Sequence, residues 1–508
     1  MNIRQAKEYI KNSVNLYLKK DEFGEYQVPV VRQRPIFLLG APGIGKTAVM
    51  EQIAQEMGLA LVAYSMTHHT RQSALGLPFI TQKRYGGEEY HVSEYTMSEI
   101  IASVYDTMER SGMKEGILFL DEINCVSETL APSMLQFLQY KVFGRHRVPE
   151  GWVIVTAGNP PEYNKSVREF DVVTMDRLKT LRVEPDYRIW REYAVERQVH
   201  SAILNYLDLK KDSFYVMEMT AAGRSFVTAR GWEDLSEILY LYEEEQLSVE
   251  ESLVGQYLHN ERVVKEFTAY YDLYNKYKRD YRIQDILEER PSVQAIARAK
   301  EAGFDERLSL LGMLLDRMQA DMKEIMETAA FLTEVKAPLK AIQAKTTESV
   351  PHMLDIQAEG RRKLLQNLRE ANSLSEEEQR KQRRVIRFLE EARKELYISD
   401  AAAEGDLSEG QAAFACLQKK YNSAVARLKQ DTGKVQNRLH ALFVFAEEAF
   451  AQGNEMLILV TELTVGKASS QFIATFGSED YSRHNKELML SERQADIREA
   501  IEGLSLSI

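Results

Sequence analysis

One octapeptide constrains the fold of this chain more than any other feature. It reads GAPGIGKT over residues 40–47, follows the apolar run 36–39 directly and opens a helical pattern over 48–54. A glycine-rich turn between a strand and a helix binds phosphate, because the loop amides and the helix N-terminus point at the anion. The pattern predicts a nucleotide-binding α/β sheet. The expected nucleotide contacts are Gly40, Ala41, Pro42, Gly43, Ile44, Gly45, Lys46, Thr47 and Ala48.

Hydrolysis of a nucleotide requires acidic side chains beside this loop. The apolar run 117–120 is typical of a buried parallel strand and ends in Asp121 and Glu122. Carboxylates at the C-terminal end of such a strand face the ligand crevice of an open α/β sheet. We expect Lys46 to reach the β- and γ-phosphates, and Thr47 and Asp121 to hold Mg²⁺. Glu122 is then the residue that orients or deprotonates the attacking water.

A third strand is predicted at residues 152–157, and it runs into Gly158 and Asn159. An amide at the end of this strand can position the attacking water next to the γ-phosphate, which is the role called sensor 1. The alternative is an ordinary asparagine turn before a proline. Asn159 is therefore a candidate catalytic residue.

The segments GAPGIGKT, ILFLDEIN, TAGNPP, MDRL and TARGW, in this order, resemble an AAA+ ATPase of the MoxR-type branch, relatives of the magnesium-chelatase motor subunit. The resemblance covers residues 1 to about 260. It implies a P-loop parallel sheet flanked by helices, followed by a helical lid. It also implies that Asp121 and Glu122 form the Walker B pair and that Asn159 is sensor 1.

The resemblance further implies two functional arginines. The arginine of the MDRL segment, Arg177, corresponds to the finger that acts on a neighbouring subunit's nucleotide, with Arg168 and Arg182 as rivals. Sensor 2, at the start of a lid helix, corresponds to Arg230, with Arg224 as its rival.

ATP and Mg²⁺ are the cofactors that the resemblance implies, and the partners are other copies of the chain in a ring, usually of six. A protein client is also implied, in this branch commonly a von Willebrand A-domain protein. Two other functions stay open: a nucleic-acid translocase or restriction-type NTPase, and a nucleotide-gated scaffold with little turnover. The intact pair Asp121 and Glu122 argues against the scaffold. The net charge of −12 argues against broad electrostatic capture of nucleic acid.

Composition places the chain among globular proteins. No stretch approaches the roughly 18 apolar residues of a membrane span, and residues 1–7 lack the apolar core of a signal peptide. The two cysteines, Cys125 and Cys416, lie far apart, so no disulfide framework is indicated. We expect a cytoplasmic protein.

Proline usage and periodicity divide the chain. All 12 prolines fall at or before Pro351, and apolar residues beyond about 290 repeat at heptad spacing. One stripe comprises Leu311, Leu315, Met318, Met322, Ile325, Ala329 and Leu332. Such spacing predicts long, coiled-coil-like helices. We predict an AAA+ α/β core at 1–185, a helical lid with sensor 2 at 186–258, a connecting segment at 259–290 and a helical C-terminal domain at 291–508.

Two loops in the first half carry basic residues. Residues 83–87 read as an exposed turn, and residues 141–147 as a basic hairpin before the third strand. In the resembling family such inserts face a central channel and grip the client. The alternative for both is an ordinary surface loop.

Overall fold

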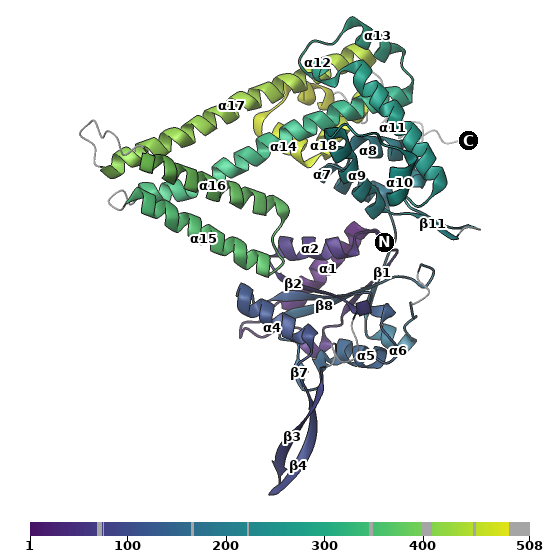
Figure 1. Cartoon of the computed structure of the whole chain (residues 1–508), viewed down its shortest axis with the longest axis vertical. Coiled ribbons are helices and arrows are strands. Elements are labelled where there is room, and N and C mark those ends of the chain that lie inside the picture. The colour runs from purple at the N-terminus through teal and green to yellow at the C-terminus, as the bar shows by residue number, and fades with distance from the viewer. Residues whose placement is uncertain are drawn as a thin grey trace, which may run out of the picture. The chain divides into compact units, whose positions relative to one another are not determined.

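The computed structural model describes residues 1–68, 74, 76–163, 167–220, 223–344, 349–398, 409–450 and 454–486. The chain forms two compact units, which we call unit 1 and unit 2 (Figure 1). Unit 1 comprises residues 1–189 together with 355–387, and unit 2 comprises 190–354 together with 388–508. The chain therefore leaves unit 1 and returns to it before it finishes in unit 2.

Unit 1 is built on a five-stranded parallel sheet with the order β2–β5–β8–β1–β9. The strands come from the apolar runs, because strands covered on both faces are apolar along their whole length. All seven residues of β8 are buried. This parallel sheet confirms the fold class that the sequence predicts for the first part of the chain. Its strands are β1 (Ile36–Gly40), β2 (Ala60–Ser65), β5 (Gly116–Asp121), β8 (Trp152–Gly158) and β9 (Lys179–Val183).

Helices cover both faces of this sheet. Along β1, Phe37 faces one core, whereas Ile36 and Leu38 face the other, because neighbouring side chains of a strand point to opposite faces. The first core takes in residues of α4 (Glu99–Ser111) and α5 (Ala131–Tyr140). The second takes in α1 (Ile3–Leu18) and α2 (Lys46–Met57). Unit 1 also contains α6 (Val172–Asp176) and the short 3-10 turns η1 (Val30–Arg32), η2 (Met66–His68) and η3 (Ile123–Cys125).

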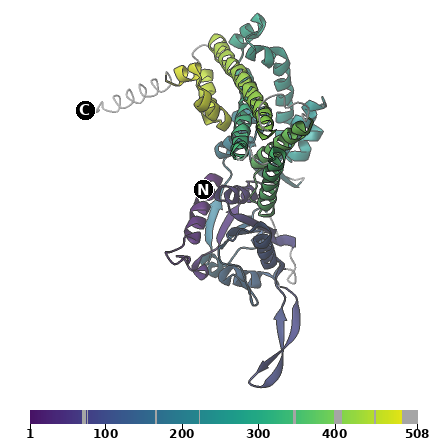
Figure 2. The same ribbon diagram turned by 90° about the vertical axis from the view of Figure 1, so that its left-hand side faces the viewer.

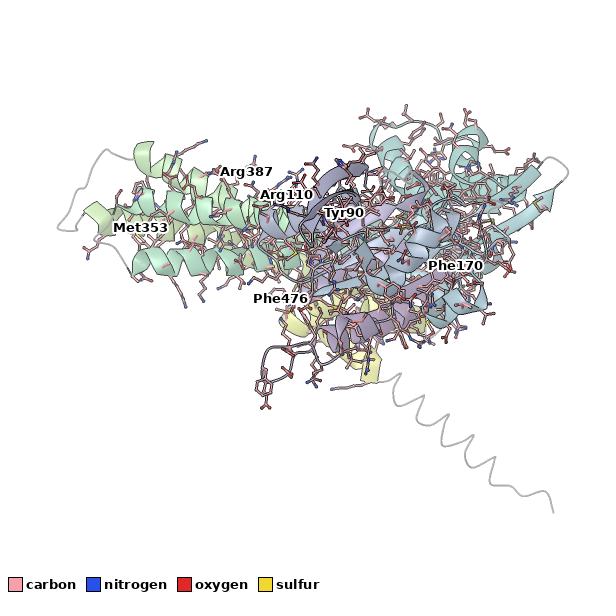
Figure 3. All side chains as sticks on the ribbon, turned by 90° about the horizontal axis from the view of Figure 1, so that it is seen from below. Tyr90, Arg110, Phe170, Met353, Arg387 and Phe476 are labelled. Atoms are coloured by element: carbon pink, nitrogen blue, oxygen red, sulfur yellow. The ribbon has the colours of Figure 1, made fainter. Side chains whose placement is uncertain are left out.

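A two-stranded ribbon extends from unit 1, formed by β3 (Pro78–Tyr85) and β4 (Glu88–Tyr95) (Figures 1 and 2). Its turn, Gly86–Gly87, has φ angles of 58° and 96°, which suit glycine. The turn predicted at residues 83–87 is confined to Gly86–Gly87, because residues 83–85 continue strand β3. Tyr90, labelled in Figure 3, lies on β4 and is 47% exposed.

A second, very short hairpin joins β6 (Val142–Phe143) to β7 (His146–Arg147). The prediction of a hairpin before the third strand is confirmed, but the expectation that Lys141 contributes to its basic surface is wrong. Lys141 is only 2% exposed, and its Nζ donates a hydrogen bond to Oε1 of Gln33 at 3.1 Å. Lys141 caps the end of α5 with a φ of 56°, and this backbone turn directs its side chain into the protein.

Unit 1 is completed by most of α15 (Val350–Glu370) and the first half of α16 (Glu376–Ile398). These helices form a hairpin whose tip is residues 371–375. Ser375 caps the start of α16, because its Oγ accepts a hydrogen bond from the Glu378 amide at 3.1 Å. Arg387, labelled in Figure 3, is the last residue of unit 1 on α16.

Unit 2 is mostly helical, which confirms the predicted helical character of the later part of the chain. Its longest helices are α14 (Phe304–Gln343) and α17 (Glu409–Phe450). Within the predicted stripe, Leu311, Leu315 and Met318 are buried in one large core with residues of α17. The other helices are α7 (Tyr187–Glu196), α8 (Ser201–Leu209), α9 (Ala229–Glu244), α10 (Glu251–Tyr257), α11 (Glu261–Tyr281), α12 (Ile283–Leu287), α13 (Val293–Glu301), α18 (Asn454–Val465) and α19 (Lys467–Phe476).

The segment predicted as a helical lid also contains an antiparallel hairpin, β10 (Val216–Thr220) with β11 (Gly223–Val227). The domain limits drawn from the sequence stay predictions, and the packing groups the residues differently. One buried core of unit 2 includes Tyr281 and Leu287 on one side of position 290 and Leu310 on the other. Among the helices that the structure describes, none combines the length and the apolar character needed to cross a bilayer.

Candidate nucleotide site

The loop after β1 has the geometry of a phosphate cradle. Gly43 and Gly45 have φ angles of 72° and 88°, a region that glycine enters without steric cost. Gly45 is the N-cap of α2 and supplies no side chain, so the first amides of the helix stay directed at the loop. A Cβ on Gly40 would lie 2.8 Å from the carbonyl oxygen of Val183. The loop therefore needs glycine at these places, and a loop that leads into a helix N-terminus fits an anion.

Lys46 begins α2 and is nearly buried, with 8% of its surface exposed. Its Nζ donates hydrogen bonds to the carbonyl oxygens of Gly40 and Ala41 at 2.8 and 2.9 Å, and to Oδ1 of Asn159 at 2.8 Å. These contacts hold the ammonium across the mouth of the loop. They also bring Asn159 to the loop, as expected for a residue that follows the strand next to β1.

Thr47 and Asp121 meet beside the loop. The Thr47 hydroxyl donates to Oδ2 of Asp121 at 3.0 Å, and Oδ1 of Asp121 accepts from the Glu122 amide at 2.8 Å. Mg²⁺ prefers oxygen ligands, commonly one or two from the protein, with water and phosphate oxygens completing the octahedron. A hydroxyl and a carboxylate at this separation, next to a phosphate loop, fit a magnesium–nucleotide complex.

Glu122 follows β5 in a left-handed conformation with a φ of 55°. Its Oε2 accepts hydrogen bonds from the hydroxyls of Ser65 at 3.1 Å and Thr67 at 3.0 Å. Ser65 ends β2 directly opposite Asp121 in the sheet register. The sequence analysis missed both hydroxyl residues. Ser65 could have been noticed as a polar residue at the end of an apolar strand. Its proximity to Glu122 could be inferred only from the strand order, which places β2 next to β5.

Asn124 is a further residue that the sequence analysis missed. Its Nδ2 donates to the carbonyl oxygen of Asn159 at 2.8 Å, so it fixes the turn that presents the Asn159 side chain. A Cβ on Gly158 would lie 2.3 Å from Oδ1 of Asn124, so Gly158 leaves room for this contact. Within the described residues, that buried Oδ1 has no hydrogen-bond partner.

Arg177 lies away from the loop of its own chain. It follows α6 and precedes β9, whose first residue, Lys179, pairs with Ile36 at the start of β1. The phosphate loop leaves β1 at the opposite end, level with Val183. Four steps along a strand correspond to about 13 Å. The side chain of Arg177 is exposed at this amino-terminal end of the sheet edge.

The rival arginines have different surroundings. Arg168 forms an ion pair with Glu128 of the same chain. Arg182 is exposed on β9, opposite Leu39 and close to the carboxyl end of β1.

The two candidates for sensor 2 lie on different elements. Arg230 lies in the first turn of α9, where the Thr228 hydroxyl accepts a hydrogen bond from the Gly231 amide at 3.2 Å. Its rival Arg224 lies on β11. Arg230 and Arg224 belong to unit 2 and are exposed. The roles of all these residues stay predictions.

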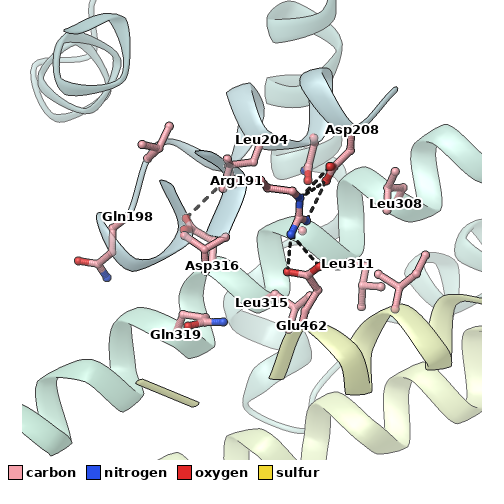
Figure 4. Close-up of a pocket in the computed structure, with 16 residues that line it drawn as sticks. Arg191, Gln198, Leu204, Asp208, Leu308, Leu311, Leu315, Asp316, Gln319 and Glu462 are labelled. Atoms are coloured by element: carbon pink, nitrogen blue, oxygen red, sulfur yellow. Dashed lines mark hydrogen bonds and ion pairs between the residues drawn. The ribbon is translucent and has the colours of Figure 1, made fainter. Parts of the chain in front are cut away.

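Unit 2 contains a cavity of about 60 Å³, lined by both apolar and charged side chains (Figure 4). Arg191 dominates it, with a bidentate ion pair to Asp208 at 2.7–3.0 Å and a second pair to Glu462 at 2.9 Å. These pairs join α7, α8 and α18 and therefore stabilise the packing of unit 2. Among the residues that the structure describes, no group of three or more His, Cys, Asp or Glu is arranged to hold a metal ion by itself.

Residues 35–178 match the family model described as an AAA domain of the dynein-related subfamily. The matched segment contains the phosphate loop, Asp121, Glu122, Asn159 and Arg177. The match supports an AAA+ ATPase with a P-loop that binds a nucleotide. No curated protein matches the chain.

Proposed function

We propose that this chain is an ATP-hydrolysing AAA+ motor of the MoxR type, which remodels or activates a protein partner as a ring oligomer, in the usual case a hexamer. One observation carries the proposal. The phosphate loop, the pair Asp121–Glu122 and Asn159 converge at the carboxyl ends of three adjacent strands, β1, β5 and β8. A phosphate-binding loop, a magnesium-binding pair and a base are the parts that hydrolysis of ATP requires.

The proposed reaction is the transfer of the γ-phosphoryl group of ATP to water. The water oxygen forms a bond to the γ-phosphorus while the bond to the β–γ bridging oxygen breaks, which leaves ADP and inorganic phosphate. Glu122 accepts the proton that the water loses, and the hydroxyls of Ser65 and Thr67 orient its carboxylate. When bound, Mg²⁺ neutralises the negative charge of the phosphate oxygens.

Lys46 and Asn159 position the phosphate oxygens and the attacking water. The ammonium of Lys46 can exchange its hydrogen bonds to Gly40, Ala41 and Asn159 for phosphate oxygens, because three donors on one rotatable group adapt to new acceptors. That exchange frees Oδ1 of Asn159 for the attacking water.

The position of Arg177 supports a shared active site. Its place at the far end of the sheet edge from its own phosphate loop leaves it available to a neighbouring chain's nucleotide. An arginine finger that acts in trans requires contacts between unlike surfaces, and such contacts close into a ring or run on as a filament. We propose the ring.

The β3–β4 ribbon favours a protein client over nucleic acid. It exposes Ile80, Tyr85 and Tyr90, with exposed fractions of 75%, 54% and 47%. Lys83 is ion-paired with Glu94, which also pairs with Arg145 of the neighbouring β6–β7 turn. Apolar and aromatic side chains suit a polypeptide, whereas nucleic acid requires basic groups that are available to phosphates. A von Willebrand A-domain protein is the client class that we propose.

The test is an ATPase assay with nucleic acid or candidate client added. Wild-type chain should release phosphate, and Lys46→Ala should stop release by removing the phosphate-binding cation. Glu122→Gln chain loaded with ATP should retain the client in a pull-down, with Lys46→Ala as the matched control. Strong stimulation of the ATPase by DNA or RNA would instead support a translocase. Absence of turnover with tight ATP binding would support a scaffold.

A further inference from the structure

The tip of the α15–α16 hairpin is bonded to the edge of the ATPase sheet. β2 is the outermost strand on its side, and it pairs with β5 along one edge. On β2, the Leu61 amide donates to the carbonyl oxygen of Ala371 at 2.9 Å, and the Leu61 carbonyl accepts from Nδ2 of Asn372 at 3.2 Å. The tip thus satisfies both backbone groups of Leu61, as a neighbouring strand would.

This contact is a packed interface within unit 1. Ala371 is fully buried in the same core as Ala60 and Val62 of β2. Asn372 has a φ of 51°, a left-handed conformation that asparagine enters more readily than most residues. The Ser373 amide donates to the carbonyl oxygen of Leu368 at 3.1 Å, which ties the tip back to α15. The backbone of the tip is therefore fixed where it meets the strand.

β2 connects this contact to the proposed catalytic glutamate. Ser65 lies four residues beyond Leu61 on the same strand, which corresponds to about 13 Å. Its hydroxyl donates to Oε2 of Glu122 at 3.1 Å. A shift of β2 along its axis would change this hydrogen bond, because the strand backbone is nearly inextensible and the surrounding core is close-packed.

The hairpin also belongs to unit 2 through its outer ends. α15 starts at Val350 and α16 ends at Ile398, and both helices run without interruption across the limits of unit 1. In unit 2, the Phe388 ring of α16 packs edge-on against Phe331 of α14, with centroids 6.0 Å apart. Lys420 of α17 forms an ion pair with Glu395 of α16 at 2.6 Å. Within unit 1, Arg361 in the middle of α15 donates to Gln382 of α16 at 2.6 Å and joins the two helices to each other.

We propose that the α15–α16 hairpin is a coupling arm between unit 2 and the ATPase site. Asn372 is its positioning residue: it holds β2 in register, and through Ser65 it sets the orientation of Glu122. The proposal rests on the proposed ATPase function. A rearrangement of unit 2 that pulls on the hairpin would then change the rate of hydrolysis without changing the nucleotide-binding loop.

The test measures steady-state ATP hydrolysis by full-length Asn372→Asp and Asn372→Gly. Both variants tolerate the left-handed backbone, and both remove the donor to Leu61. We expect kcat to fall about three- to tenfold, the effect of one lost hydrogen bond, while KM for ATP stays within about twofold. Asn367→Asp, in the last turn of α15, is the matched control and should leave both constants unchanged. If the fall in kcat is accompanied by a rise in KM beyond twofold and by a lower melting temperature, Asn372 has a merely structural role. That outcome would overturn the proposal.

A double-mutant cycle with Ser65→Ala identifies the route. The two positions share no contact, and effects of mutations more than about 7–10 Å apart normally add. Coupling along β2 predicts that the effects of Asn372→Asp and Ser65→Ala on kcat depart from additivity by about threefold or more. Additive effects would overturn the proposal. If the wild type hydrolyses ATP and Lys46→Ala does not, a failure of the cycle counts against the coupling arm alone. If the wild type has no ATPase activity, the proposed function itself fails.

Discussion

The hydroxyl of Thr47 donates a hydrogen bond to Oδ2 of Asp121 at 3.0 Å. This contact joins the first turn of α2, the helix that follows β1, to the end of β5, and β8 lies between β1 and β5 in the sheet. It places the two proposed magnesium ligands side by side. Substitution of each residue by itself measures its contribution to magnesium binding.

Replacement of Thr47 by valine should weaken magnesium binding. Valine keeps the shape of the side chain but removes the hydroxyl, so we expect the Mg²⁺ concentration for half-maximal ATPase activity to rise about 10–100-fold, the usual range for lost support at a metal site. Thr47→Ser retains the hydroxyl and is the control. Titration of activity with Mg²⁺ at saturating ATP gives the result, and equal titration curves for the valine and serine variants would remove Thr47 from the site.

Replacement of Glu122 by glutamine should separate binding from hydrolysis. Glutamine still accepts hydrogen bonds from Ser65 and Thr67 but cannot take a proton from water. We expect turnover to fall about 10²–10⁴-fold, the usual contribution of a general base, with ATP affinity retained. Asp121→Ala should weaken binding of magnesium–nucleotide as well. An assay of phosphate release measures turnover, and calorimetry measures nucleotide binding. Wild-type turnover by Glu122→Gln would reject the assignment of Glu122 as the general base.

Mixed rings should reveal whether Arg177 acts on a neighbour. Arg177→Ala and Lys46→Ala should each be inactive alone, because fingers contribute about 10³–10⁵ in rate. Mixtures should recover part of the activity at interfaces that pair an intact Lys46 with an intact Arg177. ATPase activity is measured over a range of mixing ratios, with co-assembly verified by differently tagged subunits. Verified mixed rings without recovery would direct attention to Arg182, since Arg168 is held in an ion pair with Glu128.

The buried Lys141 should make stability depend on pH. Burial lowers the pKa of Lys141 from 10.5 to about 8. The unfolded chain therefore binds this proton more strongly than the folded chain, so this term destabilises the protein below pH 8, and stability rises with pH between about 8 and 10.5. Lys141→Gln removes the charge and can keep a hydrogen bond to Gln33. It should raise the free energy of unfolding at pH 7 by at most about 3 kcal/mol, and the melting temperature should rise with it.

The gain from Lys141→Gln should shrink as the pH rises from 7 towards 10. Thermal unfolding at several pH values measures this gain in stability. Lys429 is exposed, so Lys429→Gln serves as the control. A gain that stays constant across this range would show that burial does not depress the pKa of Lys141 in solution.

The sequence predicts the parts of the site that a local pattern encodes. The phosphate loop, Asp121, Glu122 and Asn159 each follow an apolar run directly, and parallel strands place such residues at one edge of a sheet. Ser65 and Thr67 carry no such pattern, because their relation to Glu122 depends on which strand lies next to β5. The long helices were predictable from their heptad spacing.

The contact between Leu61 and the hairpin tip could not be predicted. It joins residues 310 and 311 positions apart, and neither Ala371 nor Asn372 stands out in composition or spacing. The burial of Lys141 was hidden for a similar reason, since a lysine beside a turn normally faces solvent. Both features arise from tertiary packing, which a single sequence encodes only through the sum of many weak preferences.

The bonded edge of β2 has a consequence for solubility. An edge strand with unpaired amides and carbonyls is a template on which a strand of another molecule can add. At Leu61 both groups are already occupied by the hairpin tip, and Ala371 covers the core beside them. Loss of this contact would therefore expose an adhesive sheet edge as well as disturb an active site. At Leu61 the hairpin tip therefore blocks the addition of a strand from another molecule.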